Sequence, residues 1–139
     1  MVWRPRTIRV VGYTLAGAIV LGMGTLAVVL PSSWRIADRV ALVLFSLLVA
    51  GILHLFARCR LVADDHGLTV VNPVSSRTYD WAEVVGVSMG PGQPWPTLDL
   101  AGGDSISAMG INGAEHDRAA RQLAELRALI ARYAEAPER

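Results

Sequence analysis

The side chains that could catalyse a reaction or bind a metal are few and scattered along this 139-residue sequence. His66 follows Asp64 and Asp65, and these residue types can bind zinc or another divalent ion. Three adjacent residues in a tight turn point in different directions, however, and no partner motif accompanies them. Asp and Gly are typical turn residues, so the stretch from Asp64 to Gly67 is predicted to be a hairpin turn and not a metal site.

Nucleophile and phosphate-binding motifs are missing as well. His116 lies between two acidic residues, which is typical of a solvated helix start. The serines have no nucleophile-elbow context. Gly90 to Gln93 is not followed by Gly-Lys-Ser or Gly-Lys-Thr, so it is not a phosphate loop. The sequence predicts a protein that is not an enzyme and uses no cofactor.

Cys59 is the only cysteine of the chain. An intrachain disulfide and a thiolate metal cluster are therefore excluded. The residue follows an apolar run directly, where a cysteine could be acylated. The favoured interpretation is a small residue at a helix end.

Two long apolar runs dominate the first 57 residues. Val10 to Leu30 contains no charge, and Val40 to Ala57 has His54 as its only ionisable residue. As helices they span about 31 and 27 Å, close to the roughly 30 Å hydrocarbon core of a bilayer. Residues 1–60 are therefore predicted to form a transmembrane hairpin with spans at about 10–30 and 40–57, and residues 61–139 a soluble domain.

Arginines near the ends of the two runs predict their orientation. Five lie before the first run or directly after the second, which is one side of the membrane, and two lie in the loop that connects the runs on the other side. The positive-inside rule then places both termini in the cytoplasm of a multi-pass cell-membrane protein. The alternative is a signal peptide cut after Ala27, but that site is poor and the second run would remain. The five are Arg4, Arg6, Arg9, Arg58 and Arg60, and the two are Arg35 and Arg39.

Residues at the ends and faces of the runs suggest how the hairpin is held. Interface anchors are predicted at Trp3, Trp34, Arg58 and Arg60. His54 is about one helical turn from Arg58, which favours interfacial hydrogen bonding over proton transfer. Small residues recur every four positions in the first run and are predicted to pack against a helix, most simply the other helix of the hairpin. They are Thr14, Ala18 and Gly22, and general Gly and Ala richness is the alternative explanation.

Charge narrows the function of the second part. Residues 61–139 hold six arginines and eleven acidic residues, a balance of −5, and the chain has no lysine. Nucleic-acid binding relies on neutralising phosphates, so it is excluded as a function class. Docking by charge on anionic lipid is disfavoured for the same reason.

After residue 60 the apolar pattern changes to period two, which indicates short antiparallel strands. Val85, Val87 and Met89 are expected on the buried face of one strand. Ala101 to Asp104 is predicted to be a hairpin turn that suits a positive φ. In all, about six strands are predicted, at 60–63, 68–72, 77–80, 85–89, 97–100 and 105–108.

The last segment has the pattern of an amphipathic helix. Asn112 and Glu115 have capping-box spacing at its start. Its apolar residues then follow spacings of four and three, so they share one face. A single such helix after a run of strands is expected to close one end of a bent sheet. The apolar face comprises Ala119, Leu123, Leu126, Ile130 and Tyr133.

The order of six or seven strands and a C-terminal helix, with the strings RCRLVADDHGLTVVNP, RTYDWAEVVGV, PWPTLDLAGG and RAARQLAELRALIARY, resembles a small actinobacterial pleckstrin-homology (PH)-like family. One branch is low molecular weight protein antigen 6. The resemblance implies an α+β fold, in which a two-helix membrane hairpin precedes a PH-like roll. Its motifs are structural, including a turn Gly67, a Trp81 that opens a strand and a Pro-Trp before a strand. They carry no activity that can be transferred.

The loop Gly90 to Pro96 is the most unusual stretch of the predicted soluble domain. Its prolines stiffen it, so Trp95, with Gln93 and Pro94, could anchor a protein partner at low entropic cost. The alternative is that Trp95 plugs one end of the roll. The first functional hypothesis is therefore a non-catalytic protein-docking adaptor, alone or as an accessory subunit of a membrane complex. The alternative is a lipid head-group reader. PH domains bind head groups through basic loops between their first strands, and this alternative is weaker because the matching turn here, Asp64 to His66, is acidic.

Overall fold

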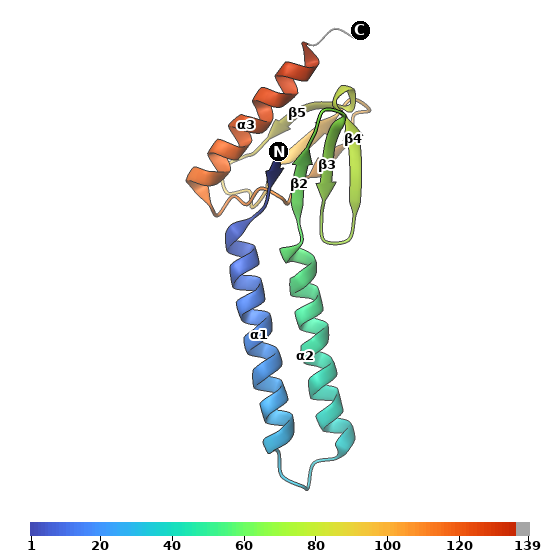
Figure 1. Ribbon diagram of the computed structural model, residues 1–139, viewed down its shortest axis with the longest axis vertical. Coiled ribbons are helices and arrows are strands. Elements are labelled where there is room, and N and C mark those ends of the chain that lie inside the picture. The colour runs from blue at the N-terminus through green and yellow to red at the C-terminus, as the bar shows by residue number, and fades with distance from the viewer. Residues whose placement is uncertain (136–139) are drawn as a thin grey trace. The chain divides into compact units, whose positions relative to one another are not determined.

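The computed structural model describes residues 1–135, and the chain forms two compact units. One unit is Thr7–Ala57, and the other combines Met1–Arg6 with the chain from Arg58 onward. Figure 1 shows the elements of each unit along the chain. The first six residues were expected in the hairpin segment and instead belong to the sheet-containing unit.

The helical unit contains α1, Arg6–Val29, and α2, Ile36–Ala57. Both are long and apolar enough to cross a membrane, and in each the most apolar 18-residue window has only 11% of its residues buried. The helices begin earlier than the uncharged runs, at Arg6 and Ile36, because flanking charges are compatible with a helix end. The two predicted apolar segments are thus helices that leave most of their apolar side chains uncovered.

The small residues of α1 do not face α2, although this was expected, and their association with a helix of another protein or copy stays a prediction. Thr14, Ala18 and Gly22 are exposed, whereas Gly12 and Ala27 are the buried residues of α1. A Cβ on Gly12 would lie 3.9 Å from the Cβ of Ala57, so this face is the one that meets α2. Residues two positions apart on a helix, such as Gly12 and Thr14, project in directions about 200° apart. The predicted stripe therefore points away from the contact with α2.

Arg39 joins the two helices at their connection. Its guanidinium donates four hydrogen bonds, of 2.6 to 3.3 Å, to backbone carbonyls at the end of α1. The last carbonyls of a helix have no partner within it, and a cation there also interacts favourably with the helix dipole. Arg39 therefore has a structural role in the turn of the hairpin. The four carbonyls belong to Ala27, Val28, Leu30 and Pro31.

Seven strands form two antiparallel sheets within the described residues. The first sheet has the order β1-β2-β3-β4 and the second the order β5-β6-β7, and α3 follows them. The predicted α+β class and C-terminal helix are confirmed. The strands are β1 Val2–Trp3, β2 Arg60–Ala63, β3 Gly67–Val71, β4 Ser76–Asp80, β5 Val84–Ser88, β6 Thr97–Leu100 and β7 Ser105–Ser107; the 3₁₀ helix η1 is Trp81–Glu83 and α3 is His116–Ala134.

The strand that the sequence did not reveal is β1. Val2 pairs with Val62 and Trp3 with Leu61, so the first residues of the chain form an edge of the first sheet. The chain then leaves the sheet, forms α1 and α2, and returns as β2. The hairpin is therefore an insertion between the first two strands of the domain.

Two local details differ from the expected pattern. Val84 is buried and Val85 is 63% exposed, although Val85 was expected in the core. The pairing of β5 with β6 shifts register between Val84 and Gly86, and such a bulge changes which side chains face inward. Trp81 opens η1 and not a strand.

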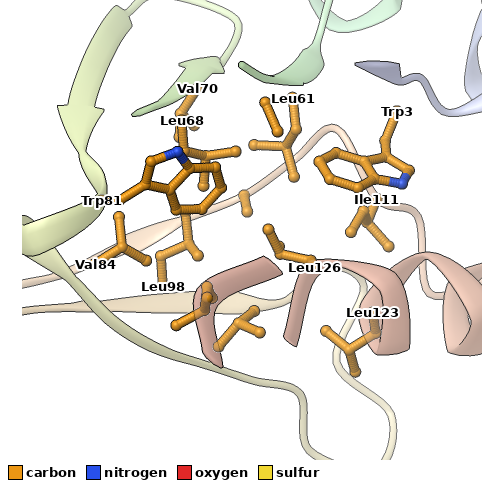
Figure 2. Close-up of a cluster of buried hydrophobic side chains, with 14 of the residues drawn as sticks. Trp3, Leu61, Leu68, Val70, Trp81, Val84, Leu98, Ile111, Leu123 and Leu126 are labelled. Atoms are coloured by element: carbon orange, nitrogen blue, oxygen red, sulfur yellow. The ribbon is translucent and has the colours of Figure 1, made fainter. Parts of the chain in front are cut away.

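The core lies between the two sheets and α3, as Figure 2 shows for its labelled side chains. Four residues of the predicted helix face are buried, and Tyr133 packs against the same cluster. The ring of Tyr133 is stacked on Trp81 with centroids 4.6 Å apart. The helical periodicity of this segment therefore identified its inner face correctly.

The expected capping box at the start of α3 was wrong. Asn112 accepts a hydrogen bond from the Ala114 amide through Oδ1, at 3.1 Å. The N-cap is Glu115, whose side chain makes no capping bond. The helix begins at His116, so Asn112 lies too early to cap it and stabilises the preceding turn instead.

Candidate functional site

The rim loop, Gly90 to Pro96, closes on itself through Gln93. Its side-chain Oε1 accepts a 2.8 Å hydrogen bond from the Gly90 amide, and its own amide donates to the Gly90 carbonyl at 3.2 Å. Gly92 supplies the positive φ of 77° that this turn needs. Gln93 was predicted as a docking residue, but its side-chain oxygen already accepts a hydrogen bond within the loop.

The rim loop is also fastened to the segment before α3. The Gly113 amide donates to the Pro94 carbonyl at 2.7 Å, and the Ala108 amide donates to the Pro96 carbonyl at 2.9 Å. A Cβ on Gly113 would collide with the Gln93 carbonyl oxygen, so this close approach requires glycine. The loop is consequently held in one conformation by backbone contacts on both of its sides.

Trp95 is half-buried on this loop and does not belong to the described core cluster. Its neighbour Pro96 is fully buried, whereas Gln93 and Pro94 are exposed. The arrangement presents part of an indole ring on a fixed backbone. Such a ring can contact a partner without the entropic cost of ordering a loop.

The Asp64 to Gly67 connection is the predicted turn, and it joins β2 to β3. Asp64 accepts hydrogen bonds from the amides of His66 and Gly67 at 2.9 and 3.0 Å. These two bonds stabilise the charged carboxylate and lower the pKa of Asp64 below its usual value of 3.8. Across residues 1–135, no group of three or more His, Cys or acidic side chains is placed to bind a metal.

Cys59 lies immediately before β2 and is 2% exposed. Burial raises the pKa of its thiol above 9.0, although the nearby Arg58 opposes this shift. A buried neutral thiol is a poor nucleophile. This environment agrees with the structural interpretation of Cys59 and not with acylation.

Of the four predicted interface anchors, Trp3 was assigned wrongly. It is 2% exposed, because β1 places its ring in the core and its indole nitrogen reaches Glu125. Trp34 is 49% exposed in the connection between the helices. Arg58 and Arg60 are exposed next to the end of α2, so the anchor role stays a prediction for these three.

His54 on α2 has a specific partner on α1. Its Nδ1 lies 3.0 Å from the hydroxyl oxygen of Tyr13, and the two rings are tilted with centroids 5.9 Å apart. A hydrogen bond of His54 was favoured over proton transfer, and the position of this pair at a membrane interface stays a prediction. The pair adds a polar contact between the two helices.

The inserted hairpin changes which turn matches the lipid-binding turn of PH domains. The sequence had matched Asp64 to His66 with the loops between the first strands, and this turn joins β2 to β3. The first connection is occupied by α1 and α2. The unit that contains the sheets also has a smaller negative charge than residues 61–139 alone. It holds ten arginines and eleven acidic residues, a net charge of −1, because it includes Arg4, Arg6, Arg58 and Arg60.

An open groove of about 310 Å³ lies between β1 and α3, and no sequence pattern predicted it. One wall comes from β1, a strand of two residues that is too short to recognise by periodicity. The other wall comes from the outer positions of α3, whose charged residues are typical of any solvated helix face. The lining residues are Met1, Val2, Trp3, Arg118, Arg121, Gln122 and Glu125.

Comparison with known proteins identifies relatives of both units. Residues 58–129 match the family model described as "Bacterial PH domain". Uncharacterised proteins of Mycobacterium bovis and of Mycobacterium tuberculosis strains H37Rv and CDC 1551 are each 39% identical over 119 residues. That alignment covers 86% of this chain and 75% of each relative. No solved structure matches the chain.

Proposed function

The chain belongs to the bacterial PH domain family, and from this premise we propose that it is a non-catalytic adaptor held in the cell membrane by α1 and α2. In this role the PH-like domain docks a protein partner at the inner face of the membrane. The family and the two apolar helices support membrane association of a PH-like domain. The orientation and the docking role are the proposed part.

The pairing of β1 with β2 carries the proposal of a hairpin. β1 precedes α1 and β2 follows α2, and the two strands pair in one sheet. A chain that crosses a bilayer between two paired strands must return to its starting side. Two crossings satisfy this requirement, and the sheet then lies on the same side as both outer helix ends.

Arginine placement supports the cytoplasmic side for that sheet. The tail and exit carry five arginines, and cytoplasmic flanks of spans are enriched in such residues. Of the two arginines on the other side, Arg39 is bound to the carbonyls that end α1. Its presence therefore has a structural reason that is independent of orientation.

The rim loop supports docking of a protein. Trp95 is partly exposed on a backbone fixed by Gly113 and Gln93, and rigid aromatic residues are frequent anchors of protein interfaces. The insertion of the helices into the first strand connection removes the turn through which PH domains would contact head groups. This favours protein over lipid as the partner.

The test combines orientation with partner capture in cells. A reporter fused after Glu135 is expected to be active only in the cytoplasm, and a periplasmic signal would overturn the orientation. Mild-detergent capture is then compared between the wild type, Trp95→Ala and the control Trp34→Ala. Selective loss with Trp95→Ala, in a domain that stays folded, is the expected result. Equal recovery by all three would remove the rim loop as the docking surface.

A further inference from the structure

We propose that the groove between β1 and α3 binds an extended, acidic segment of a partner protein. This proposal rests on the adaptor function above and adds a second surface, distinct from the rim loop. Three features of the groove carry it: a free strand edge, a buried amide and a cation that binds nothing else in the described chain. Each matches a different part of an extended peptide.

The free strand edge is the outer side of β1. The Met1 amine donates to the Ala63 carbonyl at 2.6 Å, and the Ala63 amide donates to the Met1 carbonyl at 2.8 Å. Hydrogen-bonded pairs alternate in an antiparallel ladder, so the N–H and C=O of Val2 point away from β2. β1 is the last strand of its sheet, and Val2 lines the groove. An added strand could pair with this edge.

The buried amide is the side chain of Gln122 on α3. It is only 9% exposed and lines the groove, and it makes no hydrogen bond within residues 1–135. In the described chain, every completely buried polar atom of a side chain has a hydrogen-bond partner. Since the Gln122 amide has none there, its atoms are not completely buried and are open to the groove. The accessible amide offers one group that donates hydrogen bonds and one that accepts them, and a peptide backbone can pair with both.

The free cation is Arg121, which lies beside Gln122 on α3. It is exposed and makes no ion pair or hydrogen bond within residues 1–135. Its neighbour Arg118 is already engaged, since it contacts Glu115 at 3.3 Å and the Arg4 carbonyl at 3.3 Å. Arg121 can therefore form a bidentate pair with a carboxylate of the ligand. This selects an acidic residue at one position of the bound segment.

The same features favour a peptide over a lipid head group. A strand edge and a primary amide pair with alternating donors and acceptors, which a peptide has and a phosphate lacks. Among the residues that line the groove, Glu125 is the acidic one, and it accepts a hydrogen bond from Trp3. The strand edge and the amide, and not the charge of the lining, therefore distinguish a peptide from a lipid head group.

The test uses the full chain in detergent micelles and an array of nonapeptides with one fixed Asp, Ala or Lys among randomised neutral positions. The wild type is expected to retain Asp peptides at least tenfold better than Lys peptides. Arg121→Glu should reverse this preference to Lys at the same position. Gln122→Leu should weaken all retained peptides without changing the charge preference. Arg132→Glu is the matched control, a charge reversal at the far end of α3, outside the groove.

Several outcomes would overturn the proposal. Identical preferences for the wild type and Arg121→Glu would exclude the groove, and a reversal by Arg132→Glu would reduce the effect to overall charge. Absence of peptide selection, with phosphatidylglycerol vesicles bound only when Arg121 is intact, would assign the site to lipid. Partner capture that depends on Trp95 but not on Arg121 would leave the adaptor function standing and remove the groove from it. Peptide selection that reverses with Arg121→Glu, without any partner capture in cells, would support the groove and count against the adaptor function.

Discussion

The indole Nε1 of Trp3 donates a 2.8 Å hydrogen bond to Oε2 of Glu125, which joins the first strand of the chain to its last helix. Trp3 is also part of the core, so the residues before α1 complete the domain that follows α2. Removal of the residues before α1 would therefore take away a strand of the sheet and a side chain of the core.

Trp3→Ala is expected to destabilise the sheet domain by about 3–5 kcal/mol, because it removes a large buried side chain and the bond to Glu125. Urea unfolding of the full chain in micelles, followed by labelling of the buried Cys59, measures this change. Trp34→Ala, at a half-exposed position between the helices, should change the unfolding midpoint little. Equal shifts for the two variants would contradict the core assignment of Trp3.

Leu126→Ala should destabilise the domain by about 2–5 kcal/mol, because Leu126 is fully buried in the core. The neighbouring Arg127 is exposed and donates one long hydrogen bond of 3.4 Å to the Val87 carbonyl. Arg127→Ala should therefore cost at most about 1 kcal/mol. The same urea titration compares the two, and similar losses would mean that the inner face of α3 is misassigned.

Gly113→Ala should release the rim loop, because the new Cβ would meet the Gln93 carbonyl oxygen at a distance that atoms do not adopt. Gly102→Ala is the matched control, since nothing lies within 4 Å of a Cβ there. Limited proteolysis between Gly90 and Pro96 should accelerate in the first variant only. If cleavage is unchanged, backbone contacts with Gly113 do not hold the loop.

The Asp64 turn should make stability depend on pH at its acidic end. The His66 and Gly67 amides lower the pKa of Asp64 in the folded domain below 3.8. A depressed folded-state pKa contributes stability above the unfolded value and loses it as the pH falls through the folded value. When the pH is lowered from about 5 to about 2, the free energy of unfolding should therefore fall more for the wild type than for Asp64→Asn, as urea unfolding at each pH would measure. Parallel curves would contradict the turn geometry.

Cys59 should react slowly with maleimide in the folded protein and rapidly in urea. Its thiol is buried and its pKa is raised, so little thiolate is present near neutral pH. Trp3→Ala should increase the native-state rate in proportion to the unfolded fraction. Rapid labelling of the native wild type would show that the thiol is accessible, and acylation would then become the better interpretation.

The sequence by itself determined the elements whose signals lie among near neighbours. Uninterrupted apolar runs predicted α1 and α2, period-two alternation together with the turns between strands predicted β2 to β7, and spacings of four and three predicted the inner face of α3. The Asp64 turn and the Ala101 to Asp104 turn followed from residues that favour tight backbone geometry, and Gly103 indeed has a φ of 88°. Each of these features depends on contacts within a few positions, so a local pattern is sufficient to predict it.

Only the tertiary structure decided features that depend on distant partners. Val2 and Trp3 form a strand because β2, 58 or more positions later, pairs with them. Gly12 and not Thr14 faces α2 because the rotation of one helix is set by the surface of the other. Val85 points outward because of how β5 pairs with β6. The groove that Gln122 lines exists only once β1 and α3 are brought together, and no local pattern encodes that distance.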